Sequence, residues 1–112
     1  MRPRQARDMS EVEAAWVGAM IDAEGWIVRA TAHRVNALRI CLGNTAPEII
    51  SGLLRATGVG TVCCRAFKPK HYLPYFQWSV NAWNDVMAIA KQCAPYSVKA
   101  QDVLSYTRRI TT

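Results

Sequence analysis

The chain has 112 residues, of which 51% are hydrophobic and 20% charged, a composition typical of one globular domain. Its 14 Lys and Arg residues against 8 Asp and Glu residues give a formal net charge of +6, which favours a polyanionic partner. No apolar run reaches the roughly 18 residues of a membrane-spanning helix, and no apolar segment of a signal peptide follows the basic first residues. We therefore expect an intracellular protein, cytoplasmic or in an organelle matrix, that is neither secreted nor in a membrane.

The four cysteines show no spacing typical of a metal site. They stand at positions 41, 63, 64 and 93, without a CxxC pair, and neither histidine is placed as a co-ligand. We expect them to be reduced thiols and predict no structural metal.

The first predicted element is a helix that begins at Ser10 and ends at Gly25. Ser10 and Glu13 have the spacing of a capping box, and glycine commonly ends a helix. Residues 1–9 are expected to form a flexible basic arm, and residues 10–112 a single domain. Two strands follow at 26–33 and 37–43, joined by a turn at 34–36.

A second helix is predicted to end at residue 57, with Thr45 as its N-cap and Glu48 completing a capping box. Strands at 61–68 and 72–80 flank a basic turn at 69–71, and helices at 82–93 and 98–110 are separated by Pro95. The order αββαββα, with one further helix, predicts an α+β fold. In it, helices cover one face of a four-stranded antiparallel sheet.

The other face of that sheet is expected to be basic. β-Ribbons can enter the major groove of DNA, where arginine bound to guanine is the commonest specific contact. Three tryptophans, Trp26, Trp78 and Trp83, could stack on bases, but packing in the core is the favoured interpretation. The candidate DNA-binding residues are Arg29, Arg34, Arg39, Arg65, Lys68, Lys70, His71 and Gln77.

The last turn of the first helix carries two acids, Asp22 and Glu24, at an end where the helix dipole favours cations. Their presence there therefore needs an explanation other than helix stability. One face of the same helix is lined by small side chains that would let a second helix come close. The residues of this face are Ala15, Gly18, Ala19, Asp22 and Ala23, and the first four are predicted to form a dimer interface.

The segment Val17-Gly18-Ala19-Met20-Ile21-Asp22-Ala23-Glu24-Gly25 closely resembles the LAGLIDADG motif of homing endonucleases. The two small residues stand in swapped order, and Glu24 replaces the last Asp of the motif. Further segments, in the right order, resemble other parts of the single-motif domain of that family. They are residues 38–45, 58–60, 75–80 and 97–102.

The resemblance implies a homodimer, because the active site of the family needs two motif helices side by side. Isologous packing of the small-residue face would bring two Glu24 carboxylates together. Clustered carboxylates favour divalent cations, so we expect Mg²⁺, with Ca²⁺ or Mn²⁺ as substitutes, bound by Glu24 with help from the Ala23 carbonyl. Asp22 is expected to bond the partner helix.

Two further residues are candidates for the active site. Lys99 matches the basic residue of the family, which orients water or stabilises charge in the transition state. Its alternative is an ordinary surface lysine near the start of a helix. Asn44 either holds an active-site water or acts as a turn or cap residue.

The family activity implied is a site-specific cut of double-stranded DNA at a long pseudo-palindromic target, leaving 3′ overhangs, in intron homing. One alternative is a LAGLIDADG-derived protein that binds without cutting, either as a splicing cofactor on intron RNA or as a DNA-binding regulator. The other alternative is an unrelated small basic RNA-binding domain. That domain would need stacking aromatic residues exposed on the sheet.

Overall fold

The first helix, α1 (Glu11–Glu24), begins at the capping box that the sequence predicts. Ser10 Oγ accepts a hydrogen bond from the Glu13 amide at 3.1 Å, and Glu13 Oε1 accepts one from the Ser10 amide at 2.9 Å. Two amides at the helix start are thereby satisfied. The structure is a computed structural model that describes residues 5–29, 38–65 and 75–111.

Gly25 ends α1 for a reason other than the one that the sequence suggests. Its backbone is extended (φ −97°, ψ 171°), so the left-handed geometry of a glycine cap is not used. A Cβ atom at this position would instead lie 2.8 Å from the carbonyl oxygen of Ile21 and 2.9 Å from that of Cys41. Glycine is required because two backbone segments pass close by.

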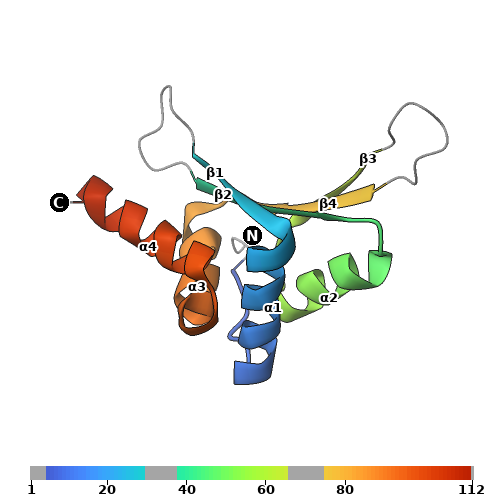
Figure 1. Cartoon of the computed structure of the whole chain (residues 1–112), viewed down its shortest axis with the longest axis horizontal. Coiled ribbons are helices and arrows are strands. Elements are labelled where there is room, and N and C mark those ends of the chain that lie inside the picture. The colour runs from blue at the N-terminus through green and yellow to red at the C-terminus, as the bar shows by residue number, and fades with distance from the viewer. Residues whose placement is uncertain (1–4, 30–37, 66–74, 112) are drawn as a thin grey trace.

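Four strands form one antiparallel sheet in the order β1-β2-β4-β3. Their bounds are β1 (Gly25–Arg29), β2 (Leu38–Asn44), β3 (Thr61–Arg65) and β4 (Tyr75–Val80). All the helices lie on one side of this sheet, and Figure 1 shows no helix over the opposite side within the described part of the chain. The predicted α+β fold class is confirmed. The parts of the predicted strands and turns at 30–37 and 66–74 lie outside the described residues.

Alternation along the strands places the core between sheet and helices. Ile40, Leu42, Trp78 and Val80 point toward the helices and are buried, in register with one another across β2 and β4. The Trp78 side chain is fully buried, and its indole Nε1 donates a hydrogen bond to the Val59 carbonyl at 3.0 Å. This satisfies the polar atom of the largest core residue.

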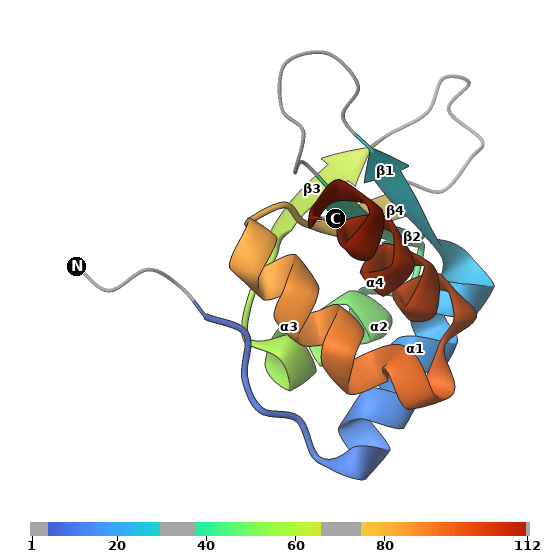
Figure 2. The same cartoon turned by 90° about the vertical axis from the view of Figure 1, so that its left-hand side faces the viewer.

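The second helix, α2 (Pro47–Thr57), starts later than predicted. Thr45 is not its N-cap. The N-cap is Ala46, which makes no side-chain hydrogen bond, and proline occupies the first turn, where its missing N–H costs nothing. Helix α3 (Trp83–Cys93) leads through the 3₁₀ turn η1 (Ala94–Tyr96) into α4 (Val98–Thr111). Figure 2 shows α3 and α4 side by side, with α1 beyond them.

Residues 5–9 do not form the free arm that the sequence analysis expects. The Arg7 amide donates to the Thr57 carbonyl at 2.7 Å, and its guanidinium binds the carbonyls of Arg55 and Ala56 at the end of α2. On the α3 side, Gln92 binds the backbone of Arg7 and Met9. The segment is held in place because the Arg7 guanidinium binds carbonyls that have no partner within the helix at the end of α2. Residues 1–4 lie outside the described range.

Within the ranges that the structure describes, no helix has both the length and the apolar character needed to cross a membrane.

Candidate active site

Asp22, in the last turn of α1, is bound to the start of α4. Its Oδ1 accepts hydrogen bonds from Ser97 Oγ at 2.8 Å and from the Lys99 amide at 3.1 Å, and its Oδ2 accepts one from the Val98 amide at 2.9 Å. Burial acts to raise the pKa of Asp22, but these hydrogen bonds to the charged form outweigh it, so the pKa is lowered. These three bonds lie within the chain, and the expected bond of Asp22 to a partner helix stays a prediction.

Lys99 makes the reverse contact, from α4 to the end of α1. Its Nζ donates hydrogen bonds to the carbonyl oxygens of Gly25 at 2.7 Å, Asp22 at 3.0 Å and Ile21 at 3.4 Å. The C-terminus of a helix leaves such carbonyls unpaired and carries a partial negative charge. We call this exchange, in which Asp22 caps α4 and Lys99 caps α1, the α1–α4 clasp. It sets the Lys99 ammonium at the end of α1 that also carries Glu24.

Glu24 differs from Asp22 in having no structural role. Its side chain is exposed, and no hydrogen bond or ion pair joins it to another of the residues that the structure describes. The Ala23 carbonyl lies in the same turn and is not among the oxygens that Lys99 contacts. A carboxylate without a partner beside a helix-end carbonyl is the kind of oxygen donor set that Mg²⁺, Mn²⁺ or Ca²⁺ accepts. Residues 23 and 24 therefore fit the predicted metal ligands.

One side of α1 is left exposed by the rest of the chain. Val12 is 80% exposed and Trp16 37% exposed, and Ala19 and Ala23 are exposed further along the helix. The steps of four, three and four residues place these side chains in one stripe that ends beside Glu24. We call Val12, Trp16, Ala19 and Ala23 the α1 stripe. Ala15 is half-buried at its border.

Gly18, which was predicted to face a partner helix, is buried inside the chain. A Cβ atom there would lie 3.3 Å from the Cβ atoms of both Tyr96 and Ser97. The small residue therefore allows η1 and the start of α4 to approach α1. The small-residue face predicted from spacing thus mixes two surfaces: Gly18 and Asp22 meet α4, whereas Ala19 and, in part, Ala15 remain accessible.

Two of the predicted DNA contacts, Arg39 and Gln77, lie on the uncovered face among the side chains that the structure describes. Arg39 is exposed on this face, and Gln77 lies there half-buried. Trp26 is also on this face and 40% exposed, so the expectation that it packs in the core is wrong. Arg65 lies in β3, opposite Tyr75 in the register. Its side chain, together with Arg34, Lys68, Lys70 and His71, lies outside the described residues.

Arg29 is not on the uncovered face. It follows Ile27 by two residues along β1 and so points toward the helices, where its guanidinium carbon lies 4.7 Å from the centre of the Tyr106 ring of α4. Arg29 therefore lies apart from Arg39 and Gln77, because the alternation of the strand directs its side chain to the helical layer; that it binds DNA stays a prediction.

Asn44 serves the turn into α2. Its Oδ1 accepts a hydrogen bond from the Ala46 amide at 2.8 Å, the geometry of an Asx turn at the end of β2. Of the two roles considered for this residue, the structure shows the turn role. A role in holding water stays a prediction and would use the amide nitrogen or the second lone pair of Oδ1.

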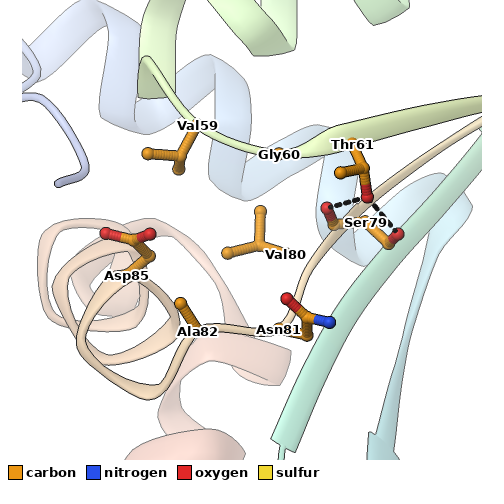
Figure 3. Close-up of a pocket in the computed structure, with 8 residues that line it drawn as sticks. All are labelled: Val59, Gly60, Thr61, Ser79, Val80, Asn81, Ala82 and Asp85. Atoms are coloured by element: carbon orange, nitrogen blue, oxygen red, sulfur yellow. Dashed lines mark hydrogen bonds between the residues drawn. The ribbon is translucent and has the colours of Figure 1, made fainter. Parts of the chain in front are cut away.

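A cavity of about 220 Å³ lies at the C-terminal end of β4, beside the start of α3 (Figure 3). Thr61 Oγ1 is bonded there to the carbonyl and hydroxyl oxygens of Ser79, and the carboxylate of Asp85 points toward it from α3. Asp85 is already engaged, since its Oδ1 accepts a hydrogen bond from the Ala6 amide at 2.9 Å. None of the predicted metal or DNA ligands is among the described residues that line this cavity.

Comparison with solved structures shows what this fold is. The chain is similar to the homing endonuclease I-CvuI in complex with its DNA target in the presence of Ca, with a TM-score of 0.66 and 16% identity over 91% of this chain and 69% of that one. It is similar to the archaeal intron-encoded homing endonuclease I-Vdi141I complexed with DNA, with a TM-score of 0.66 and 14% identity over 90% and 68%. The fold is that of homing endonucleases.

A second I-CvuI complex, with uncleaved DNA and Mg, matches the chain with a TM-score of 0.61 and 16% identity. No family model matches the sequence, and no curated protein is similar to it in sequence. The homing endonuclease fold is thus shared at identities where pairwise sequence similarity is lost. Within it, the clasp between Asp22 and Lys99 was missed by sequence reasoning, because no local pattern joins residues 77 positions apart.

Proposed function

We propose that this protein is a homodimeric, site-specific endonuclease that makes metal-dependent double-strand breaks in DNA, with Glu24 as the metal-binding acid. The observation that carries the proposal is that two acids in the last turn of α1, Asp22 and Glu24, have different surroundings. Both carboxylate oxygens of Asp22 are bonded in the clasp, whereas Glu24 is exposed, has no hydrogen bond or ion pair to another described residue, and lies at a helix end where the dipole disfavours an acid. A carboxylate that contributes nothing to the fold in such a place is explained by a ligand.

The α1 stripe supports the homodimer. Its small side chains, Ala19 and Ala23, permit close approach of a second helix, and Val12 and Trp16 would bury apolar surface against it. Packing about a two-fold axis that runs along the helices would bring both Glu24 side chains together. The same operation would bring the uncovered faces of two sheets into one surface. Two-fold symmetry of that surface suits a long pseudo-palindromic target.

The chemistry assigned to the site divides between an ion and the chain. When bound, Mg²⁺ would supply a polarised water and neutralise charge on the scissile phosphate. Glu24, with the Ala23 carbonyl, would hold the ion at the helix end. The Lys99 ammonium, whose three N–H donors are bonded to carbonyls at the end of α1, would stabilise through its charge the negative charge that develops on the phosphate; to orient the attacking water it would have to give up one of these bonds. Breaks with 3′ overhangs are proposed from the family resemblance.

Binding of DNA would rest on the basic character of the chain and on the uncovered face. The net charge of +6 doubles in a dimer, and Arg39 and Gln77 offer groups suited to base edges in the major groove. Arg34, Arg65, Lys68, Lys70 and His71 remain proposed contacts.

The deciding experiment is cleavage of a library of candidate DNA sites in Mg²⁺ by the wild type and by Glu24→Gln. We expect the wild type to cut one long, nearly symmetric site. Glu24→Gln should bind the same site and leave it intact, because the amide is a poorer ligand for a hard cation. Binding of a site by both proteins, with cleavage by neither, would refute the enzyme and favour a regulator. Selective binding of intron RNA instead would favour the splicing cofactor.

The dimer is tested separately by sedimentation of Ala19→Arg, with Asn84→Arg on the exposed side of α3 as a control for the added charge. We expect the first variant to be monomeric and inactive, because a long cation cannot fit between two closely packed helices, and the second to behave as the wild type. A wild type that sediments as a monomer when bound to DNA would refute the homodimer.

A further inference from the structure

The first turn of α4 has all its backbone amides paired, and half of the pairs come from another helix. The amides of Ala100 and Gln101 are bonded within the turn, to Ser97 Oγ at 3.0 Å and to the Ser97 carbonyl at 3.2 Å. The amides of Val98 and Lys99 are bonded to the two carboxylate oxygens of Asp22. The end of α1 therefore completes the cap of α4, and the place where α4 begins depends on Asp22.

Lys99 is the residue that this arrangement controls most directly. Its amide is bonded to Asp22, and its Nζ is bonded to three carbonyls at the end of α1. A lysine side chain has four rotatable bonds and loses considerable rotamer freedom when it is held in one place. With the backbone of Lys99 anchored 3.1 Å from Asp22 Oδ1, the ammonium reaches the end of α1 that carries Glu24.

We propose that Asp22 is a positioning residue of the nuclease site: through the first turn of α4, its carboxylate holds the Lys99 ammonium in place relative to Glu24. It does so from within the chain, without touching metal, DNA or a partner helix. The inference rests on the proposed function, since it assigns Asp22 a role at the same site. It also explains the second acid of the helix end, whose cost against the dipole is offset by three hydrogen bonds.

Three donors point at Asp22, so a carboxylate is required and an amide does not suffice. An ionised carboxylate is an acceptor only, whereas asparagine would turn its NH₂ group toward the Val98 or the Lys99 amide. Proline at position 98 would remove one of these donors. Val98 is exposed and is the first residue of α4, where proline is favoured, and Ser97 (φ −145°, ψ 122°) has the extended backbone that precedes proline. Val98→Pro should therefore relieve Asp22→Asn.

The test measures single-turnover cleavage in Mg²⁺ and DNA affinity in Ca²⁺ for Asp22→Asn and for Asp22→Asn with Val98→Pro. We expect Asp22→Asn to cleave roughly 10- to 100-fold more slowly, since a displacement of about 1 Å can cost 10²-fold, with affinity changed less than about 3-fold. The double variant should recover most of the rate. Ser10→Ala is the matched control: it removes the cap at the other end of α1 and should cleave as the wild type.

The cleavage rates of these variants either support or refute the positioning role of Asp22. Cleavage by folded Asp22→Asn at the wild-type rate, or equal losses in Asp22→Asn and Ser10→Ala, would overturn the positioning role while leaving the proposed function intact. A wild type that cuts no DNA would overturn both. If Asp22→Asn does not fold, Ser97→Ala takes its place; it removes one donor to Asp22 together with the acceptor of the Ala100 amide, and leaves the two amides that bind Asp22. A rate for Ser97→Ala equal to that of the wild type would then refute the role.

Discussion

Replacing Gly25 by alanine tests the close approach of backbone segments at the end of α1. The new Cβ atom would lie 2.8 Å from the Ile21 oxygen and 2.9 Å from the Cys41 oxygen. Ordinary contact begins near 3.4 Å, so each neighbour would have to move by roughly half an ångström, and both are backbone atoms. The residue cannot turn away, because β1 is paired with β2 at this position.

The expected loss of stability follows from two opposing terms. Overpacking of this kind costs about 1–3 kcal/mol, and the smaller conformational freedom of alanine in the unfolded chain returns about 0.4–1 kcal/mol. We therefore expect Gly25→Ala to lower the free energy of unfolding by about 1–2 kcal/mol and Tm by about 4–8 °C. The shift of β1 away from α1 would also move the Gly25 carbonyl, which binds Lys99, and so lower the cleavage rate.

Urea unfolding followed by circular dichroism measures the loss, and Gly43→Ala in the adjacent strand is the control. A Cβ atom at Gly43 would meet the Tyr75 ring at 3.0 Å, a milder contact that involves a side chain in place of two backbone oxygens, so the expected change is within about 0.5 kcal/mol. Equal stabilities for Gly25→Ala and the wild type would refute the reasoning. So would a loss at Gly43 as large as the loss at Gly25.

Three further predictions concern other parts of the chain. Burial, together with the charge of Asp22, raises the pKa of Cys93 to about 11, so alkylation of this thiol in the native protein should become fast only near that pH; rapid modification at pH 8 would contradict its burial. Arg39→Ala should weaken DNA binding and reduce the salt dependence of the affinity. Arg29→Ala should leave the affinity unchanged and lower the free energy of unfolding by about 0.5–1 kcal/mol. The reverse pattern would show that the two faces of the sheet have been assigned the wrong way round. Arg7→Ala should lower the free energy of unfolding by about 1–2 kcal/mol in urea titrations, with exposed Asp8→Ala unchanged as the control; no effect at Arg7 would restore the flexible arm.

The order of elements was readable from the sequence because its signals are local. The capping box at Ser10, the alternation of Leu38, Ile40 and Leu42, and the glycine after residue 57 each involve neighbouring residues, and the structure contains all three features. The motif at residues 17–25 also identified the fold, although no sequence comparison does so. Local patterning therefore sufficed for the α+β architecture.

Contacts between distant segments could not be read in this way. Spacing along α1 grouped Gly18 and Asp22 with Ala19, but only the packing of η1 and α4 separates the two surfaces. Arg29 was grouped with the DNA contacts, but its guanidinium lies over the ring of Tyr106 in α4, and no pattern in β1 predicts that contact. Both cases have one cause. The spacing of residues along a helix or strand shows which side chains share a face, but it does not show which other element packs against that face.

The lack of contacts between Glu24 and the other described residues has a consequence for how such a protein evolves. Because no other described residue leans on its carboxylate, almost any replacement there should leave a chain that still folds. In the proposed nuclease, a single substitution at Glu24 would then abolish cleavage of the nucleic acid and leave its binding intact. The proposed nuclease therefore lies one substitution at Glu24 from a protein that binds the same target without cutting it, whereas a substitution at Asp22 would also change the hydrogen bonds between α1 and α4.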